Sequence, residues 1–394
     1  MVFLSSIIAC SALLISLVSG TVTPSNLQTR SNQTTSSERL GLKFSGTNSS
    51  LPKILILFTG GTIASGSIYG DLDDTQYGQL QISGETIVAR DPTLYNISQL
   101  AVSNWTTTND GSTGTNDALV MNMTRFTYDA LCSPDSDITG AVFTHGTNSL
   151  EETAFLMDAL IHCGKPVVGT GAMRPYTDIS FDGDANFFQA VALAANEDSK
   201  NRGAMVAFND RIWSGFWVTK LTPNVPDAFG STAGGELGAF LNNMPYYYNT
   251  PSTPYQKYFF DIERVSNDSS FPSLPKVDIL YTMRQFDGQL VLDCLKNGAK
   301  GVVIGGTGNG GLPNGSKQVA QALEQGLITV VGTRSPFGAS TPERAPTYAK
   351  SGYMHLIQSR IMLQLAIASG FNQNQTIELF ESSLRKTIGQ PFVY

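Results

Sequence analysis

The chain has 394 residues, of which 41% are hydrophobic and 10% aromatic, so it is long enough to bury a large core and to divide into two domains. Only 14% of the residues are charged, against roughly 25% in ordinary soluble domains. The 25 basic and 32 acidic residues give a formal net charge of −7. This composition excludes a disordered chain and a fibre, and it argues against nucleic acid as a partner.

The first twenty residues have the features of a secretory signal peptide. An uncharged apolar run with a few serines, Phe3 to Val18, precedes the small residues Ser19 and Gly20, although the usual basic start is missing. The run is at the short edge of what spans a bilayer, and no later apolar stretch of about 18 residues follows. We therefore expect a protein that is secreted to the extracellular space, cell wall or periplasmic space, with no membrane contact once the signal is removed.

Sequons of the form N-x-S/T support export. They occur at eight positions, namely Asn32, Asn48, Asn96, Asn104, Asn122, Asn267, Asn314 and Asn374. Eight sequons in a chain so poor in charge suggest a glycosylated surface. Residues 21–50 are rich in Ser, Thr, Asn and Gln and nearly free of apolar residues, so we expect a mobile, glycosylated segment there and folded structure from about Pro52.

Short apolar runs then alternate with longer amphipathic stretches, which is typical of buried parallel strands joined by crossover helices. The predicted strands are Ile54–Phe58, Gly140–Phe143, Pro166–Gly169, Ala204–Phe208, Val277–Tyr281, Gly301–Ile304 and Ile328–Val331. The predicted helices are Leu150–Ile161, Ala185–Ala195, Leu290–Lys296, Lys317–Gln325 and His355–Ser369. Between about residues 246 and 275 no periodicity survives. The pattern predicts an α/β protein with an N-terminal domain over 51–250, a linker over 251–274 and a C-terminal domain over 275–394.

A glycine turn with two threonines, T-G-G-T-I-A at Thr59–Ala64, directly follows the first predicted strand. In an open α/β sheet this is the carboxyl edge of a strand, where ligands bind. The glycines allow close approach to a substrate and leave N–H groups free to stabilise an oxyanion, which makes Thr62 a candidate nucleophile. A plain tight turn is the alternative. The turn matches neither the glycine motif of dinucleotide-binding sites nor that of phosphate-binding loops.

A second strand, glycine turn and threonine occur at Val142–Thr147, directly before a predicted helix. Two strand ends that present threonines at one sheet edge are far less expected by chance than one. The chain has only three histidines and no G-x-S-x-G motif, so we interpret His145 as a structural residue beneath the turn. No H-E-x-x-H motif or paired Cys/His spacing indicates a metal site.

The cysteines leave two interpretations open. Removal of the signal also removes Cys10, which leaves Cys132, Cys163 and Cys294. This odd number permits one disulfide and one buried thiol. Three buried small hydrophobic residues are the alternative.

Four motifs in order resemble the bacterial-type L-asparaginases, in particular the secreted type II branch that also occurs in yeast and fungal cell walls. They are T-G-G-T-I-A at Thr59–Ala64, T-H-G-T-x-x-x-E-E-T-A at Thr144–Ala154, G-A-M-R-P at Gly171–Pro175 and G-F-W-V-T-K at Gly215–Lys220. The likeness runs from about Leu51 to the C-terminus. It implies a larger N-terminal domain with a mostly parallel sheet and flanking helices, a smaller C-terminal α/β domain, and hydrolysis of L-asparagine without a metal or organic cofactor. It also implies a homotetramer whose sites are shared between subunits.

The resemblance assigns catalytic roles residue by residue. Thr62 matches the threonine that attacks the side-chain amide, and Tyr77, with Tyr69 as the alternative, matches the tyrosine that assists it. A threonine hydroxyl does not ionise unaided, so it needs a neighbouring proton acceptor. Thr147 matches the second catalytic threonine and Lys220 its partner lysine. Burial lowers a lysine pKa, so a desolvated Lys220 is a candidate base at neutral pH.

Four further residues match substrate-binding or supporting positions of the family. Ser112 and Thr113 lie on the loop that meets the substrate α-carboxylate, where this chain retains the serine but lacks the Gln/Asp pair common in bacterial members. Asn309 matches an asparagine that reaches across a subunit interface. Glu343 is the only carboxylate within Ser340–Arg344, where the acidic partner of the tyrosine relay is expected. Cys132 and Cys163 flank the second motif at positions that resemble the disulfide of secreted members.

Position 148 departs from the family pattern, because Asn148 stands where the family has an aspartate that meets the substrate α-ammonium and the lysine. A neutral contact there replaces a charge-assisted one. We therefore keep three hypotheses: a secreted asparaginase, a non-catalytic secreted glycoprotein of the same fold, and an amidohydrolase for glutamine or another ω-amide. Retention of Thr62, Thr147 and Lys220 favours the first.

Overall fold

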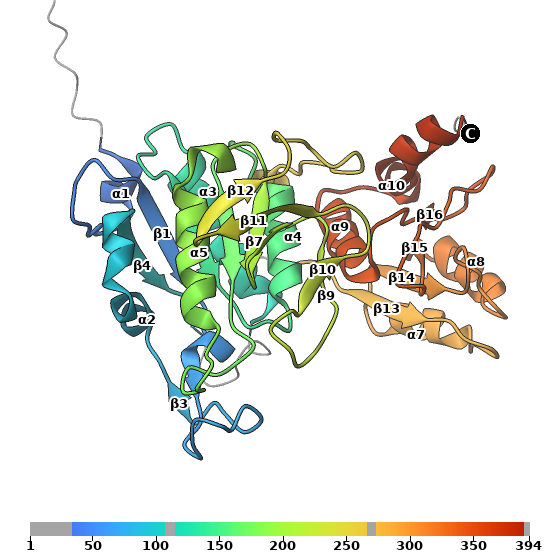
Figure 1. Cartoon of the computed structure of the whole chain (residues 1–394). Helices are drawn as coiled ribbons and strands as arrows, with labels where there is room; N and C mark the ends of the chain where they lie inside the picture. Colours follow the sequence, from blue (N-terminus) through green and yellow to red (C-terminus); the bar gives the residue numbers. More distant parts are fainter. Residues whose placement is uncertain (1–33, 107–114, 266–272, 390–394) are drawn as a thin grey trace, which may run out of the picture. The chain divides into compact units, whose positions relative to one another are not determined.

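The computed structural model describes residues 34–106, 115–265 and 273–389. Its larger sheet has, among these residues, eight strands in the order β12-β11-β8-β7-β6-β5-β1-β4 (Figure 1). Five are parallel: β1 (Lys53–Phe58), β4 (Gln99–Asn104), β5 (Gly140–Thr144), β6 (Val167–Thr170) and β7 (Ala204–Phe208). The other three extend it in antiparallel fashion: β8 (Arg211–Ser214), β11 (Glu236–Leu241) and β12 (Met244–Tyr247).

Helices cover both faces of this sheet, which explains why its central strands are apolar throughout. On β1, Ile54 and Ile56 pack in one core cluster with α5 (Gly183–Ala195) and α2 (Gly84–Arg90). Leu55 and Leu57 point to the opposite face, where they pack with α3 (Asp117–Cys132) and α4 (Leu150–Leu160). The continuous hydrophobic run of β1, which predicted a buried parallel strand, therefore places side chains in two core clusters, one on each face of the sheet.

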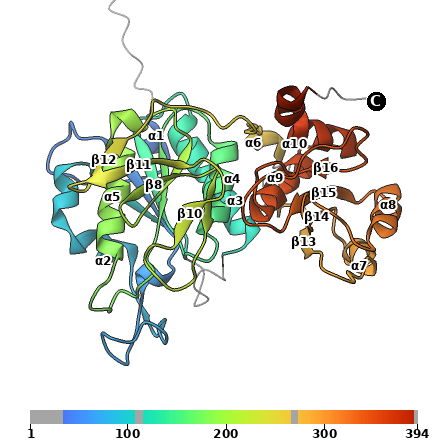
Figure 2. The same ribbon diagram turned by 45° about the vertical axis from the view of Figure 1, so that its right-hand side comes forward.

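The C-terminal sheet has four parallel strands within the described residues, in the order β13-β14-β15-β16. They are β13 (Val277–Tyr281), β14 (Gly301–Gly306), β15 (Ile328–Thr333) and β16 (Ala349–Lys350). Figure 2 shows α7 (Gln289–Lys296) and α8 (Ser316–Glu324) on one side and α9 (Leu356–Ala368) and α10 (Gln373–Ile388) on the other. The α/β fold with a larger N-terminal and a smaller C-terminal parallel sheet is confirmed.

Short elements complete the chain. They are α1 (Ser36–Arg39), α6 (Ile262–Val265), β2 (Ser65–Gly66), β3 (Leu80–Gln81), β9 (Val218–Lys220), β10 (Phe229–Ser231), and the 3-10 turns Thr62–Ala64, Pro92–Asn96 and Glu197–Ser199. No helix in the described part of the chain is long and apolar enough to cross a membrane.

Residues 34–50 differ from the mobile segment that the sequence suggested, and folded structure begins before Pro52. The short helix α1 is held by Asp137, whose carboxylate accepts hydrogen bonds from the Ser37 backbone and hydroxyl at 3.1 and 2.7 Å. Lys53 pairs with the same carboxylate at 2.5 Å. Because polar side chains make these contacts, the polar composition of the segment did not predict that it would be folded. The signal segment and the rest of 21–50 lie outside the described residues.

The segment predicted as a linker packs tightly where it is described. Phe260 is buried in the core cluster that joins α4 to α9, and Lys257 forms a buried ion pair with Asp158 at 2.7 Å. Residues 34–394 accordingly group as one compact unit. Helices α3 and α4, which cover one face of the larger sheet, therefore share a core cluster with the C-terminal sheet.

The cysteine pairing agrees with the resemblance. Cys132, the last residue of α3, is bonded to Cys163, which follows α4 by three residues. Cys294 is a buried free thiol. The structure thus selects one disulfide and one thiol over three unpaired cysteines.

Candidate active site

Two glycine turns meet where the chain order of the parallel sheet reverses. Strand β1 lies between β4 and β5, and the turns at Thr59–Thr62 and Thr144–Thr147 leave the carboxyl ends of β1 and β5. Such a switch point is where open α/β sheets bind ligands. The Thr59 hydroxyl donates to the Thr144 carbonyl at 2.6 Å and ties one turn to the other.

Glycine is required where the turns touch. Gly61 has φ +91°, and a Cβ there would lie 2.5 Å from the Cα of Gly146. The close approach of these two backbones places the threonine after each glycine beside one cavity. The third motif packs beneath them, since a Cβ at Gly171 would lie 2.5 Å from the His145 carbonyl oxygen.

Thr62 is paired with Tyr77. The Thr62 Oγ1 and the Tyr77 hydroxyl lie 3.2 Å apart, and either atom can be the donor. Tyr77 comes from the loop between β2 and β3, which the Gly78 N–H anchors to the Gly66 carbonyl at 3.0 Å. Tyr69, the alternative, is 64% exposed and is not among the residues that line the cavity. The structure therefore places Tyr77, and not Tyr69, beside the candidate nucleophile.

Thr147 is paired with Lys220. The Lys220 Nζ donates to the Thr147 Oγ1 at 2.8 Å and to the Asn148 Oδ1 at 3.3 Å. Lys220 is the last residue of β9 and is half-buried, and this burial lowers the pKa of its ammonium group. The lowered pKa increases the fraction of neutral amine, which is the form that can accept a proton from a hydroxyl.

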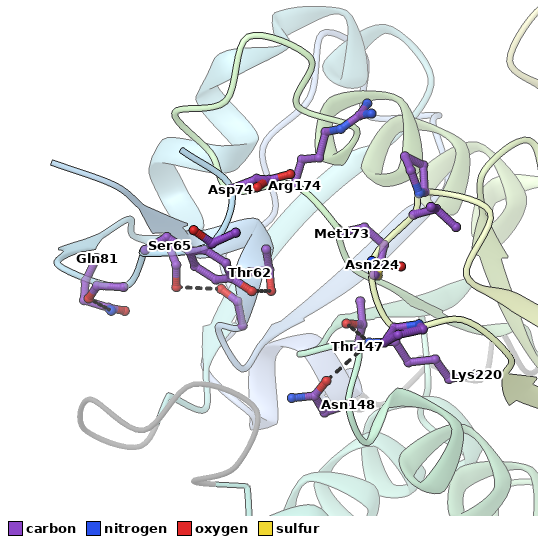
Figure 3. Close-up of a pocket in the computed structure, with 17 residues that line it drawn as sticks. Thr62, Ser65, Asp74, Gln81, Thr147, Asn148, Met173, Arg174, Lys220 and Asn224 are labelled. Carbon is purple, nitrogen blue, oxygen red and sulfur yellow. Dashed lines mark hydrogen bonds between the residues drawn. The ribbon is translucent and has the colours of Figure 1, made fainter. Parts of the chain in front are cut away.

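Both pairs face one cavity of about 570 Å³ (Figure 3). Its walls are Gly61, Thr62, Ser65, Asp74, Thr75, Tyr77, Gly78, Gln81, Thr147, Asn148, Met173, Arg174, Lys220, Pro223, Asn224, Val225 and Pro226. Sequence reasoning did not assign a role to Asp74, Arg174 or Asn224. Arg174 lies within the third motif, and this motif was the sequence signal that could have identified it. Its backbone N–H donates a hydrogen bond to the Asp182 carboxylate at 2.9 Å.

His145 has the structural role that the sequence indicated. Its ring is fully buried, with Nδ1 2.8 Å from the Gly146 carbonyl oxygen and Nε2 3.0 Å from the Thr153 hydroxyl. Burial lowers its pKa to about 4, so the ring is neutral at physiological pH. These two contacts connect the second glycine turn to helix α4.

Asn309 and Glu343, the two remaining predicted residues that the structure describes, do not line this cavity. Ser112 and Thr113 lie outside the described residues. Asn309 follows β14 and exchanges hydrogen bonds with Thr341 at 2.7 and 2.8 Å. The Glu343 carboxylate binds the Lys350 Nζ at 3.0 Å. Neither Asn309 nor Glu343 lines the cavity of its own chain, so a role across a subunit interface stays a prediction.

The site therefore contains two hydroxyl groups, a phenol and a desolvated amine around a polar cavity without a histidine base. A threonine hydroxyl beside a proton acceptor is the arrangement of nucleophilic acyl transfer. Backbone N–H groups of a glycine turn are suited to stabilise the oxyanion that such a reaction forms.

Comparisons with known proteins agree with this chemistry. Residues 53–253 match the family model "Asparaginase, N-terminal", and residues 276–380 match "Glutaminase/Asparaginase C-terminal domain". The chain is 39% identical to L-asparaginase 2-3 of Saccharomyces cerevisiae over 341 residues, 84% of this chain and 91% of that protein. It is 34% identical to L-asparaginase 2 of Escherichia coli over 349 residues, 86% of this chain and 96% of that protein.

A solved structure gives the same result for the fold. The crystal structure of a probable cytoplasmic L-asparaginase from Campylobacter jejuni matches with a TM-score of 0.74 and 30% identity, covering 84% of this chain and 99% of that one. Since both family models match in order and the similar proteins cover most of the sequence, the chain belongs to the asparaginase family.

Proposed function

We propose that this protein hydrolyses the side-chain amide of L-asparagine to L-aspartate and ammonia, with Thr62 as the nucleophile. The observation on which the proposal rests is that the Thr62–Tyr77 and Thr147–Lys220 pairs face one cavity. Membership of the asparaginase family and relatives named L-asparaginase support it. The substrate is a small amide amino acid.

The proposed reaction has two halves. The Thr62 oxygen attacks the amide carbon while its proton passes to the Tyr77 oxygen, which gives up its own proton in relay to the amide nitrogen, and the C–N bond breaks as that nitrogen leaves as ammonia. Water then adds to the ester carbon, the bond to Thr62 breaks, and L-aspartate is released. Lys220, through its hydrogen bond to Thr147, accepts and returns a proton on the far side of the cavity.

Ammonia release by the purified protein tests the proposal. We expect turnover with L-asparagine, and slower or no turnover with L-glutamine and D-asparagine. L-Glutamine is longer by one methylene, and D-asparagine presents its ammonium group on the wrong side. A preference for L-glutamine would make the protein an amidohydrolase of the longer amide. No ammonia from any of the three would favour the non-catalytic glycoprotein.

Asn148→Asp is expected to lower KM for L-asparagine by about 5-fold to 150-fold, because a carboxylate in place of the amide adds roughly 1–3 kcal/mol to a contact with the substrate ammonium. Asn148 lines the cavity beside Lys220, so the new charge faces the substrate. Initial-rate kinetics give KM and kcat separately. Asn224→Asp, which adds a carboxylate elsewhere on the same wall, is the matched control. An unchanged or raised KM in Asn148→Asp would place the ammonium contact at another residue.

We also propose that the protein is secreted and glycosylated. Support comes from the apolar segment 1–20, from the disulfide, which is typical of oxidising compartments, and from the sequons. The described sequon asparagines at 48, 96, 104, 314 and 374 are exposed, and Asn122 is partly exposed. Endoglycosidase treatment of the protein from the culture medium or cell wall is expected to increase its electrophoretic mobility. Unchanged mobility would contradict glycosylation.

We further propose a homotetramer in which Asn309 and Glu343 complete the cavity of a neighbouring subunit. Asn309 follows β14 and Glu343 follows β15 of the C-terminal parallel sheet, and both residues are exposed. Asn309 donates a hydrogen bond to Thr341, and Glu343 accepts one from Tyr348. Sedimentation velocity is expected to give four times the mass of one chain. A monomer with full activity would contradict the shared site.

A further inference from the structure

The charge beside Lys220 is the feature that the proposed mechanism leaves unexplained. The two side-chain partners of its Nζ, Thr147 and Asn148, are both neutral. Among the residues that the structure describes, the carboxylate whose negative charge acts on Lys220 belongs to Glu151. The charge that acts on the half-buried amine thus comes from helix α4, three residues after the position where Asn148 stands.

Glu151 is a buried residue whose carboxylate is hydrogen-bonded to the backbone of Lys220. It lies in the first turn of α4 and is 9% exposed. Its Oε2 accepts a hydrogen bond from the Lys220 backbone N–H at 3.1 Å, and the Thr219 hydroxyl binds the same carboxylate. The N-terminal end of a helix stabilises an ionised carboxylate. These contacts fix the end of β9, and therefore the start of the Lys220 side chain, against α4.

We propose that Glu151 is a positioning residue for Lys220: its carboxylate holds the β9 backbone at the site and supplies the buried negative charge that Asn148 does not. The inference rests on the proposed function for its meaning in catalysis. The effect of the Glu151 charge on the Lys220 amine can be measured whether or not the protein turns over a substrate.

The direction of the effect follows from the neighbouring groups. Burial lowers the pKa of Lys220, and the charge of Glu151 raises it in part. Burial also raises the pKa of Glu151 itself to about 6, with Glu152 adding to the rise, so Glu151 is ionised at pH 7 and above. Glu152 is itself paired with Arg360 of α9. From other elements, Asp74 and Arg174 line the cavity that Lys220 faces.

Glu151→Gln keeps the size of the side chain and removes its charge. The pKa of Lys220 is then expected to fall, because the variant lacks the negative charge of Glu151 that raises it. Competitive acetylation measures this directly, because only the neutral amine reacts: the extent of labelling of the Lys220 peptide, read by mass spectrometry against pH, gives the midpoint. Glu152→Gln, on the same helical turn, is the matched control and leaves the midpoint unchanged.

Two further variants separate charge from position. Asn148→Asp combined with Glu151→Gln moves the carboxylate to the other side of the amine and is expected to return the midpoint toward the wild-type value. Glu151→Asp keeps a charge but withdraws it by one methylene, so its midpoint is expected between those of wild type and Glu151→Gln. This variant decides the question if Glu151→Gln does not fold. A wild-type midpoint in every folded Glu151 variant would overturn the proposal.

Enzyme assays then distinguish this inference from the proposed function. If Lys220 acts as a base, the acid limb of the kcat profile moves to lower pH in Glu151→Gln by the same shift that labelling gives. A shifted midpoint in Glu151→Gln, found together with a wild-type protein that releases no ammonia, would sustain the charge coupling and reject the asparaginase activity. An active wild type together with an unshifted midpoint in Glu151→Gln would do the reverse.

Discussion

Thr62→Ala is expected to reduce kcat for L-asparagine by about 10³-fold to 10⁵-fold, because the variant has no oxygen to form the covalent intermediate. The substitution removes a hydroxyl and a methyl group from a partly exposed side chain whose hydroxyl is paired with Tyr77, so the fold is expected to persist. Ammonia release under saturating L-asparagine measures the loss, with circular dichroism and thermal unfolding as the check on folding.

Thr62→Ser is the matched control, since it keeps the oxygen and loses only the methyl group. It is expected to retain activity within about 10-fold of wild type. Thr62→Ala with near wild-type kcat would remove Thr62 from the nucleophile's role. Thr147 would then be the next candidate, because its hydroxyl faces the same cavity.

The parallel strands were predictable because burial on both faces leaves a simple trace in sequence. Lys53–Phe58 and Ala204–Phe208 are nearly all apolar, and the predicted bounds agree to within a residue or two. Strand β4 was not predicted, because Gln99, Ser103 and Asn104 break its apolar run. It is the last strand of the larger sheet within the described residues and carries an isolated bridge between Leu100 and Ser45. Helix α3 and helix α10 were also not predicted.

The two candidate catalytic pairs, Thr62–Tyr77 and Thr147–Lys220, were predictable only in part. The motifs identified Thr62, Thr147 and Lys220, and the contact between Gly61 and Gly146 explains why two glycine turns were needed. Choosing Tyr77 over Tyr69 required the path of the loop between β2 and β3. No role was assigned to Asp74, or to Glu151 although it lies within the second motif, because a carboxylate's partners depend on tertiary contacts that neither periodicity nor spacing encodes.

Lys220→Met is expected to lower kcat by about 10²-fold to 10⁴-fold, the usual contribution of a positioned base. Methionine keeps much of the length and apolar stem of the lysine but has no nitrogen to accept a proton or to bind the Thr147 Oγ1. Burial lowers the pKa of Lys220, so the wild-type amine is increasingly protonated, and the rate falls, as pH drops through that lowered value. The pH profile of kcat is therefore expected to lose this acid limb in Lys220→Met.

Lys220→Arg separates the two roles that a lysine can have here. Arginine remains charged at every accessible pH, so it supplies a donor and a positive charge but no base. If the amine accepts a proton, Lys220→Arg is expected to be as slow as Lys220→Met. Recovery of activity in Lys220→Arg would instead mean that Lys220 acts as a fixed positive charge that orients Thr147. A wild-type kcat in Lys220→Met would show that the Thr147–Lys220 pair is structural, and that the proton of the reaction leaves by way of Tyr77 alone.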